Sequence, residues 1–226
     1  MLKLVHAADL HIDSPLRGLD RYDGAPVHAL RHATRRALEN LVTLTLDEGA
    51  SVLLLAGDLF DGEWRDFGTG LYFAGQLARL REAGARVVLV RGNHDASSVV
   101  TSHLRLAEHV TELSTAAPET CVLEDLGLAI HGQGYRSRAV RDDLAAACPA
   151  PLRDLVNVGL LHTSLDGRPG HEPYAPARRE TLLEKGYAYW ALGHVHAREV
   201  VSTEPWVVFS GNLQGRHARE VGPKGA

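Results

Sequence analysis

One pattern constrains the fold more than any other: apolar runs of strand length recur along the chain, and each stops at residues able to do chemistry. The first half contains three such runs: residues 2–8 before Asp9, 51–56 before Asp58, and 86–90 before Asn93. Short apolar runs with polar ends predict buried strands. The stretches between them, near 26–48 and 70–83, space their apolar residues as helices do. This alternation predicts parallel strands with helices packed on the sheet.

The second half repeats the pattern less regularly. Two of its predicted strands stop at histidines, residues 156–161 at His162 and residues 188–192 just before His194 and His196. Chemistry in open α/β sheets gathers beyond the carboxyl ends of the strands, so these histidines are expected to meet the polar residues of the first half. The other elements predicted here are strands near 120–123, 127–131, 199–203 and 206–210 and a helix near 138–147. With no linker or repeat, the sequence predicts a single domain over residues 1–226.

Composition narrows the class of protein. Apolar residues make up 45% and charged residues 23%, which excludes disordered and disulfide-rich chains. Lys and Arg number 24 against 28 Asp and Glu, so a net charge of -4 gives no bulk attraction to nucleic acid, and any such contact needs a local patch. Two cysteines without zinc-knuckle spacing, and no apolar run typical of a signal peptide or membrane helix, predict a cytoplasmic protein.

The strand ends together supply a set of metal-ligand side chains: Asp9, His11, Asp58, Asn93, His162, His194 and His196. Carboxylate, amide and imidazole ligands without a thiolate suit Mn²⁺, Fe or Zn²⁺. Seven ligands exceed what one catalytic ion uses, whereas two ions bridged by a carboxylate use them all and can clamp the attacking and leaving oxygens at a phosphorus atom. Asp58 is the expected bridge, because it stands alone at the end of its strand.

Each motif alone also has a plain structural interpretation. Asp9 and Asp58 could cap turns, the Asn93-His94-Asp95 segment could be a simple turn, and His162 could be a core histidine with a satisfied ring. What favours a metal centre over these alternatives is that all the motifs occur together, in this order, at predicted strand ends.

In this order the motifs resemble those of the calcineurin-like metallophosphoesterases. The matching blocks are Asp9-Leu-His11, Gly57-Asp58, Gly92-Asn-His-Asp95, His162 and Gly193-His-Val-His196. The segments 57–61, 173–176 and 214–217 are further similar to the bacterial DNA-repair exonuclease branch that includes SbcD and YhaO. This resemblance implies a four-layer α/β/β/α sandwich of two mixed sheets flanked by helices. The β-α-β order alone would instead suggest one doubly wound sheet.

The resemblance also implies roles for individual residues. One ion would take Asp9, His11, Asp58 and His196, and the other Asp58, Asn93, His162 and His194, with Mn²⁺ the expected metal and Fe or Zn as alternatives. His94 would stay off the metals and stabilise the transition state or protonate the leaving oxygen, with Asp95 orienting it. Related nucleases carry a histidine where this chain has Asp61, so that histidine's role is not carried over. The capping domain that follows in the family is expected to be absent.

The function implied is a metal-dependent DNA nuclease, an exonuclease subunit in DNA repair that works with an SMC-like ATPase. Dimerisation in relatives predicts a homodimer face around Phe67, Leu71, Leu104 and Leu106. Two alternatives stay open. A small-molecule phosphodiesterase or phosphatase would use the same two ions, and the negative net charge favours it. A scaffold that binds DNA ends or the ATPase without cutting is disfavoured by the complete ligand set.

Overall fold

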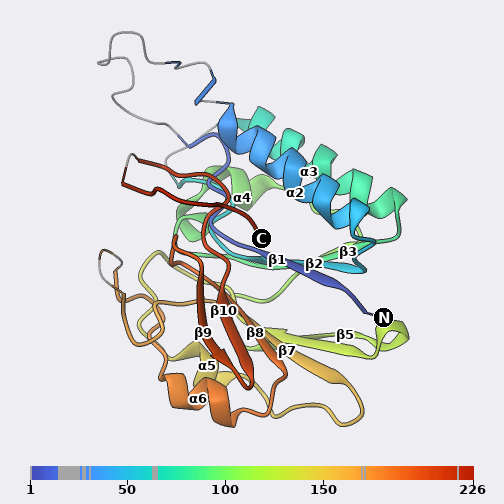
Figure 1. Cartoon of the computed structure of the whole chain (residues 1–226), viewed down its shortest axis with the longest axis vertical. Coiled ribbons are helices and arrows are strands. Elements are labelled where there is room, and N and C mark those ends of the chain that lie inside the picture. Colours follow the sequence, from blue (N-terminus) through green and yellow to red (C-terminus); the bar gives the residue numbers. More distant parts are fainter. Residues whose placement is uncertain are drawn as a thin grey trace.

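The computed structural model describes residues 2–14, 26, 29–30, 32–62, 66–168, 170, 172–217 and 219–226. Two β-sheets face each other, and helices cover the outer face of each (Figure 1). Helices α2 and α3 lie over the first sheet, and the short helices α5 and α6 lie beneath the second. This confirms the four-layer arrangement and corrects the single doubly wound sheet that the order of elements alone suggested.

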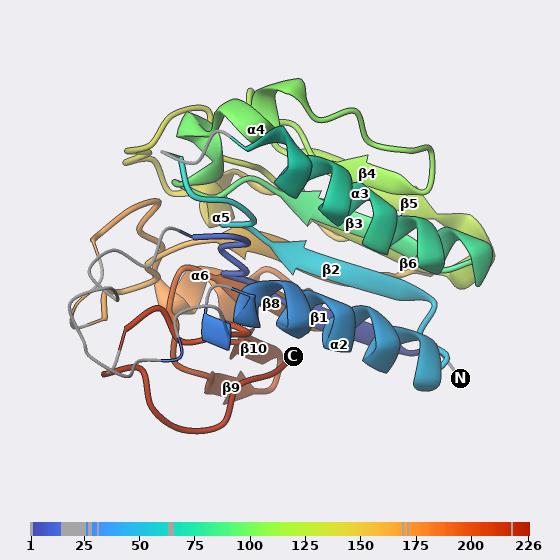
Figure 2. The same ribbon diagram turned by 90° about the horizontal axis from the view of Figure 1, so that it is seen from above.

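The first sheet is built from the β-α-β-α-β half of the chain, in the order β1-β2-β3-β4, and all its strand pairs are parallel. Its elements are β1 (Leu4–Ala7), α2 (Ala33–Asp47), β2 (Val52–Ala56), α3 (Phe67–Glu82), β3 (Arg86–Val90) and β4 (Val110–Glu112). Asp66 caps α3 by accepting a hydrogen bond from Gly68 N at 2.8 Å, which satisfies one of the helix's open amides. Figure 2 shows α2 and α3 running side by side over this sheet.

The second sheet is mixed, in the order β5-β6-β7-β8-β10-β9. Its inner pairs are parallel, and the two outer pairs, β5 with β6 and β10 with β9, are antiparallel. Its strands are β5 (Glu119–Leu123), β6 (Leu128–Gly132), β7 (Val156–His162), β8 (Tyr189–Gly193), β9 (Glu199–Thr203) and β10 (Trp206–Phe209), and its helices are α5 (Leu144–Ala147) and α6 (Arg179–Glu184). The parallel inner strands deliver the ends of β7 and β8 to the same edge.

Strand β2 shows how the layers are held together. Its side chains alternate between two buried clusters: Leu53 and Leu55 pack with α2 and α3, while Val52, Leu54 and Ala56 pack against the second sheet. All five residues are fully buried, which is why the sequence shows a continuous apolar run instead of an alternating one. The two sheets are therefore fixed relative to each other by an apolar interior, and their carboxyl ends open at one edge.

Several short elements differ from the sequence prediction. Strand β4, the helix α4 (Val99–His103) and α6 carry too few residues for a periodic signal, so the sequence does not predict them. The helix expected near 138–147 is reduced to α5, which Asp143 begins by accepting from Ala146 N at 2.9 Å. Among the described residues, no helix combines the length and the apolar character needed to cross a membrane.

Candidate metal centre

The backbone is strained where the strands deliver the predicted ligands. Four of these non-glycine residues have positive φ: Asp9 at 53°, His11 at 42°, Asp58 at 53° and His194 at 99°. L-residues avoid this region, and each such conformation costs of the order of 1 to 3 kcal/mol unless the surroundings hold it. Hydrogen bonds between neighbouring loops hold it here, from Asp9 N to Gly57 O and from His11 N to Asp58 O, both at 3.0 Å. Strain concentrated at one edge of the sheets indicates a functional site.

Close approach of the backbone fixes Asp58 at the centre. A Cβ atom at Gly92 would collide with the Asp58 carboxylate, so only glycine lets the turn after β3 pack this tightly. The same carboxylate accepts a hydrogen bond from His94 N at 2.9 Å. Burial disfavours its charge, but the imidazoles of His162 and His11 outweigh burial and hold the pKa of Asp58 well below its usual range. Asp58 is therefore a buried carboxylate that stays ionised.

Carboxylates and imidazoles from three different strand ends form one side of the centre. His196 Nε2 lies 3.8 Å from Asp9 Oδ1, and His11 Nε2 lies 3.8 Å from Asp58 Oδ2. Asp9 Oδ1 and His11 Nε2 are buried and have no hydrogen-bond partner among the described residues. Buried polar atoms are rarely left this way, so these two atoms await a ligand.

On the other side of the centre, two side-chain oxygens lie close to the ring of His162. Its Nδ1 donates to Ala56 O at 2.9 Å, so Nε2 is the ring atom that faces Asn93 Oδ1 at 3.1 Å and Asp58 Oδ2 at 3.4 Å. Burial lowers the pKa of His162, but the charge of Asp58 and the hydrogen bond to it prevail and raise it to about 9. A position that attracts a proton so strongly also suits a metal cation.

His194 joins the centre differently. Its ring lies 5.1 Å from that of His162, and its backbone N donates to Asp9 Oδ2 at 3.0 Å. Its Nε2 contacts the carbonyl of Glu172 at 2.8 Å. Burial and the charge of His162 lower the pKa of His194 to about 4, so the ring is neutral near pH 7, as a metal ligand must be.

The predicted ligands fit a pair of divalent ions. Three groups of side chains each bring ligand atoms within 4.8 Å of one another: Asp9, His11 and His196; Asp9, Asp58 and His162; His11, Asp58 and His94. The ring nitrogens that face away are held by acceptors, His11 Nδ1 by Asp61 at 3.1 Å and His196 Nδ1 by Glu220 at 2.6 Å. Such outer contacts fix the tautomer and leave Nε2 for a metal. Asp58 is shared by two of these groups, as are Asp9 and His11, and its Oδ2 lies within 3.8 Å of both His11 Nε2 and His162 Nε2.

His94 stands at the mouth of the centre beside Asp61. Its Nδ1 donates to Asp61 Oδ1 at 2.9 Å, and about a quarter of its side chain is exposed. Burial lowers the pKa of His94, but the hydrogen bond to Asp61 and the charge of Asp58 outweigh burial and raise it. His94 is thus easier to protonate than a free histidine, and its Nε2 is the atom that can hand over that proton.

The orienting role expected of Asp95 falls to Asp61. Asp95 is buried and its carboxylate accepts hydrogen bonds from the backbone N of Leu59, Phe60 and Gly92 at 2.9, 3.0 and 3.0 Å. It therefore ties the turn after β2 to the turn after β3 and does not contact the ring of His94. Sequence reasoning misses the roles of Asp61 and Glu220, because both lie in irregular segments without a periodic signal.

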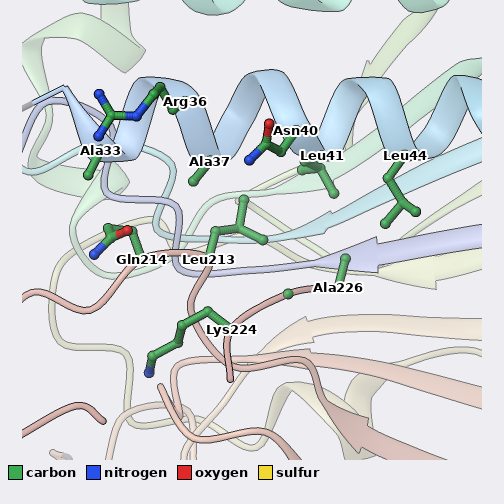
Figure 3. A pocket seen from close by; sticks show the side chains of 11 residues that line it. Ala33, Arg36, Ala37, Asn40, Leu41, Leu44, Leu213, Gln214, Lys224 and Ala226 are labelled. Carbon is green, nitrogen blue, oxygen red and sulfur yellow. The ribbon is translucent and has the colours of Figure 1, made fainter. Parts of the chain in front are cut away.

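A cavity elsewhere on the molecule is separate from the centre. It has a volume of about 400 Å³ and lies between α2 and the C-terminal segment. Figure 3 shows Arg36 and Asn40 on its helical side and Gln214 and Lys224 across from them. None of the predicted metal ligands lines it, so the chemistry belongs to the open edge of the sheets.

Comparison with solved structures supports the fold. The chain superposes on a dimetal phosphatase from Danio rerio with a TM-score of 0.56 at 12% identity, covering 94% of this chain and 88% of that one. It superposes on TT1561 of Thermus thermophilus with a TM-score of 0.53 at 14% identity, covering 94% and 91%. At such low identities these neighbours establish the fold alone.

Comparison with known sequences identifies the family. The chain is 36% identical to the metallophosphoesterase YhaO of Bacillus subtilis over 228 residues, which cover 99% of this chain and 56% of YhaO. It is 27% identical to the DNA double-strand break repair protein Mre11 of Methanopyrus kandleri over 216 residues, covering 86% of this chain and 44% of Mre11. The chain thus spans about half the length of these relatives. Residues 2–198 match the family model of the calcineurin-like phosphoesterases, and the chain belongs to that family.

Proposed function

We propose that this protein is a metal-dependent nuclease that hydrolyses phosphodiester bonds of DNA at a two-metal centre. The observation that carries the proposal is that buried side chains able to bind metal gather around Asp58, with His94 beside them at the mouth of the centre. Asp58 Oδ2 lies 3.8 Å from His11 Nε2 and 3.4 Å from His162 Nε2, between the two predicted ligand sets. A pair of divalent ions, for which Mn²⁺ is the first candidate, would supply charge and Lewis acidity to the phosphoryl group.

The chain's own residues supply the proton. Asp61 is a carboxylate and can only accept, so His94 Nδ1 must be its donor and Nε2 is directed elsewhere. A protonated Nε2 can give its proton to the departing oxygen while the imidazolium charge stabilises the transition state. Asp95 holds the two turns that carry Asp58 and His94 in a fixed relation through its three backbone contacts.

The choice of DNA as substrate is supported by similarity and not by charge. The relative from Methanopyrus kandleri is a DNA double-strand break repair protein, and its match extends over 86% of this chain. The net charge of -4 means that DNA must be held at the centre and not by the surface as a whole. An SMC-like ATPase partner, a homodimer and a cytoplasmic location complete the proposal.

The test is a nuclease assay with three substrates: linear duplex DNA, a single-stranded oligonucleotide and bis-p-nitrophenyl phosphate. We expect hydrolysis of DNA with Mn²⁺ and none after chelation by EDTA. Hydrolysis of bis-p-nitrophenyl phosphate without cleavage of either DNA would overturn the nuclease and favour a small-molecule phosphodiesterase. Binding of DNA ends without any metal-dependent hydrolysis would instead favour a scaffold.

A further inference from the structure

Arg216 enters the mouth of the metal centre from the segment after β10. Its Nη2 donates to both oxygens of Asp61, at 3.0 and 2.8 Å, and to Ser14 Oγ at 3.3 Å. Its backbone N donates to Glu220 Oε2 at 2.6 Å, and Glu220 also holds His196. Arg216 is thus fixed at both ends by residues that support the centre.

Within the described part of the chain, the rest of the guanidinium has no hydrogen-bond acceptor. Nε is buried without a partner among the described residues, and the hydrogen bonds of the side chain to Asp61 and Ser14 all use Nη2. A quarter of the side chain is exposed. Asp61 contacts both His11 and His94. Among the described Lys and Arg residues, Arg216 is the one whose side chain pairs with such a residue of the centre's surroundings. An arginine held this way has donors to spare for an anion.

We propose that Arg216 binds the phosphate that follows the scissile one on the leaving side of a polynucleotide. The proposal rests on the proposed nuclease function and adds a substrate subsite to it. Asp61 Oδ1 accepts from His94 at 2.9 Å and from Arg216 at 3.0 Å, so one carboxylate places the guanidinium next to the proposed proton donor. Because the proposed function places His94 at the leaving oxygen, Arg216 would lie toward whatever is attached to that oxygen. In a nucleic acid the next group of opposite charge there is a phosphate.

The subsite separates polynucleotides from small esters. A simple phosphodiester has a single phosphate, which the metal centre and His94 engage, and nothing for Arg216 to bind. Charge-assisted hydrogen bonds of an arginine to a phosphate are among the stronger polar contacts, so losing them should lower kcat/KM by about 10- to 100-fold. The loss should appear chiefly in KM, because the contact lies outside the reacting atoms.

The experiment compares three thymidine dinucleotides: the bare dinucleoside phosphate, the same molecule with an added 5′ phosphate, and the same molecule with an added 3′ phosphate. We expect the wild-type protein with Mn²⁺ to prefer the one whose extra phosphate sits on the leaving nucleoside. Arg216→Gln should abolish that preference and leave the bare dinucleotide much less affected. Arg136→Gln is the matched control, since it removes the same charge from an exposed pair with Asp142. It should keep the preference.

Arg216→Lys guards against a folding defect, because it keeps the charge beside Asp61 and should retain part of the preference. An equal loss by Arg216→Gln on all three dinucleotides would mean that Arg216 acts only by holding Asp61, and would overturn the subsite. So would a wild-type protein that cleaves all three equally well. Hydrolysis of bis-p-nitrophenyl phosphate but of no dinucleotide would instead sink the nuclease function on which the subsite rests.

Discussion

The two edges of the first sheet differ in the residues that carry left-handed backbone. At the amino ends of β2 and β3, positive φ is carried by glycines, Gly49 at 59° and Gly84 at 76°, and a Cβ atom at either would meet nothing within 4 Å. At the carboxyl ends Gly57 carries it at 86°, but aspartate and histidine carry it as well, for example Asp9 and Asp58, both at 53°. Glycine adopts this conformation without penalty and the other residues do not.

The difference separates what the fold needs from what the chemistry needs. At the amino edge a turn needs only to reverse the chain, so a residue with no side chain serves best. At the carboxyl edge the side chain itself is required, and the strain is accepted to place it. Substitutions at the amino edge should therefore change stability without activity, and substitutions at the carboxyl edge should act first on activity.

The largest effect should follow Asp58→Asn. In the proposed centre Asp58 would be a ligand of both ions, and a neutral amide binds them much more weakly; stabilisation by the metals amounts to several kcal/mol, so activity should fall about 10⁴-fold or more. Elemental analysis after gel filtration measures the accompanying loss of metal, which EDTA treatment of the wild type should reproduce. Full metal content in the variant would show that Asp58 does not bridge.

His94→Ala should come next, with DNA cleavage lowered by about 10²- to 10⁴-fold because general-acid assistance is lost. Metal content should stay unchanged, which distinguishes this variant from Asp58→Asn. The loss should be smaller on bis-p-nitrophenyl phosphate, whose leaving group departs without a proton. Release of metal by His94→Ala would instead place His94 among the ligands, an arrangement that its position near His11 and Asp58 would allow.

Asp61→Asn should cost less, about 10- to 100-fold in activity or metal affinity, as outer contacts of metal ligands usually do. The amide can still accept one hydrogen bond but no longer carries the charge that holds His11, His94 and Arg216. Steady-state kinetics over a range of Mn²⁺ concentrations separates the two effects. Asp125→Asn is the control, because Asp125 also pairs with an arginine, Arg86 at the amino end of β3, and normal activity is expected there.

The smallest effect tests the amino edge. Gly84→Ala forces a side chain into the left-handed region and should lower the free energy of unfolding by about 1 kcal/mol, measured with urea, while kcat stays unchanged. Gly75→Ala makes the same substitution inside α3, where a Cβ atom would meet nothing, and should raise stability by about 0.5 to 1 kcal/mol. A drop in activity for Gly84→Ala would contradict the separation of the two edges.

The strands and the polar residues at their ends could be predicted, because a buried strand appears in the sequence as a continuous apolar run. The strand predicted over residues 86–90 is β3 with those bounds, and the helix predicted over 70–83 is α3, which begins three residues earlier. The fold class needed the family resemblance, since β-α-β order cannot tell one sheet from two. Short elements such as β4 could not be predicted, because three residues are too few to show a periodic hydrophobic pattern.

The sequence predicts which residues form the site, but not which of them contact one another. Strand ends identify Asp9 and Asp58 as neighbours, because parallel strands of one sheet share an edge, whereas His162 reaches them from the second sheet. Which carboxylate touches His94 depends on how two irregular turns pack, and the sequence prediction chose Asp95. The hydrogen bonds decide for Asp61, and the partnership of Glu220 with His196 likewise spans 24 positions without any sequence signal.

The distribution of ligands between the two sheets has a consequence for folding. Asp9, Asp58 and Asn93 follow strands of the first sheet, whereas His162 ends β7 and the other two histidines follow β8 in the second sheet. A metal ion bound among these residues would link the two sheets, and its binding free energy would add to the stability of their packing. Loss of the metal would then weaken the packing between the two sheets before either sheet unfolds. Hydrogen exchange of the backbone amides of β2 and β7 should therefore report metal occupancy.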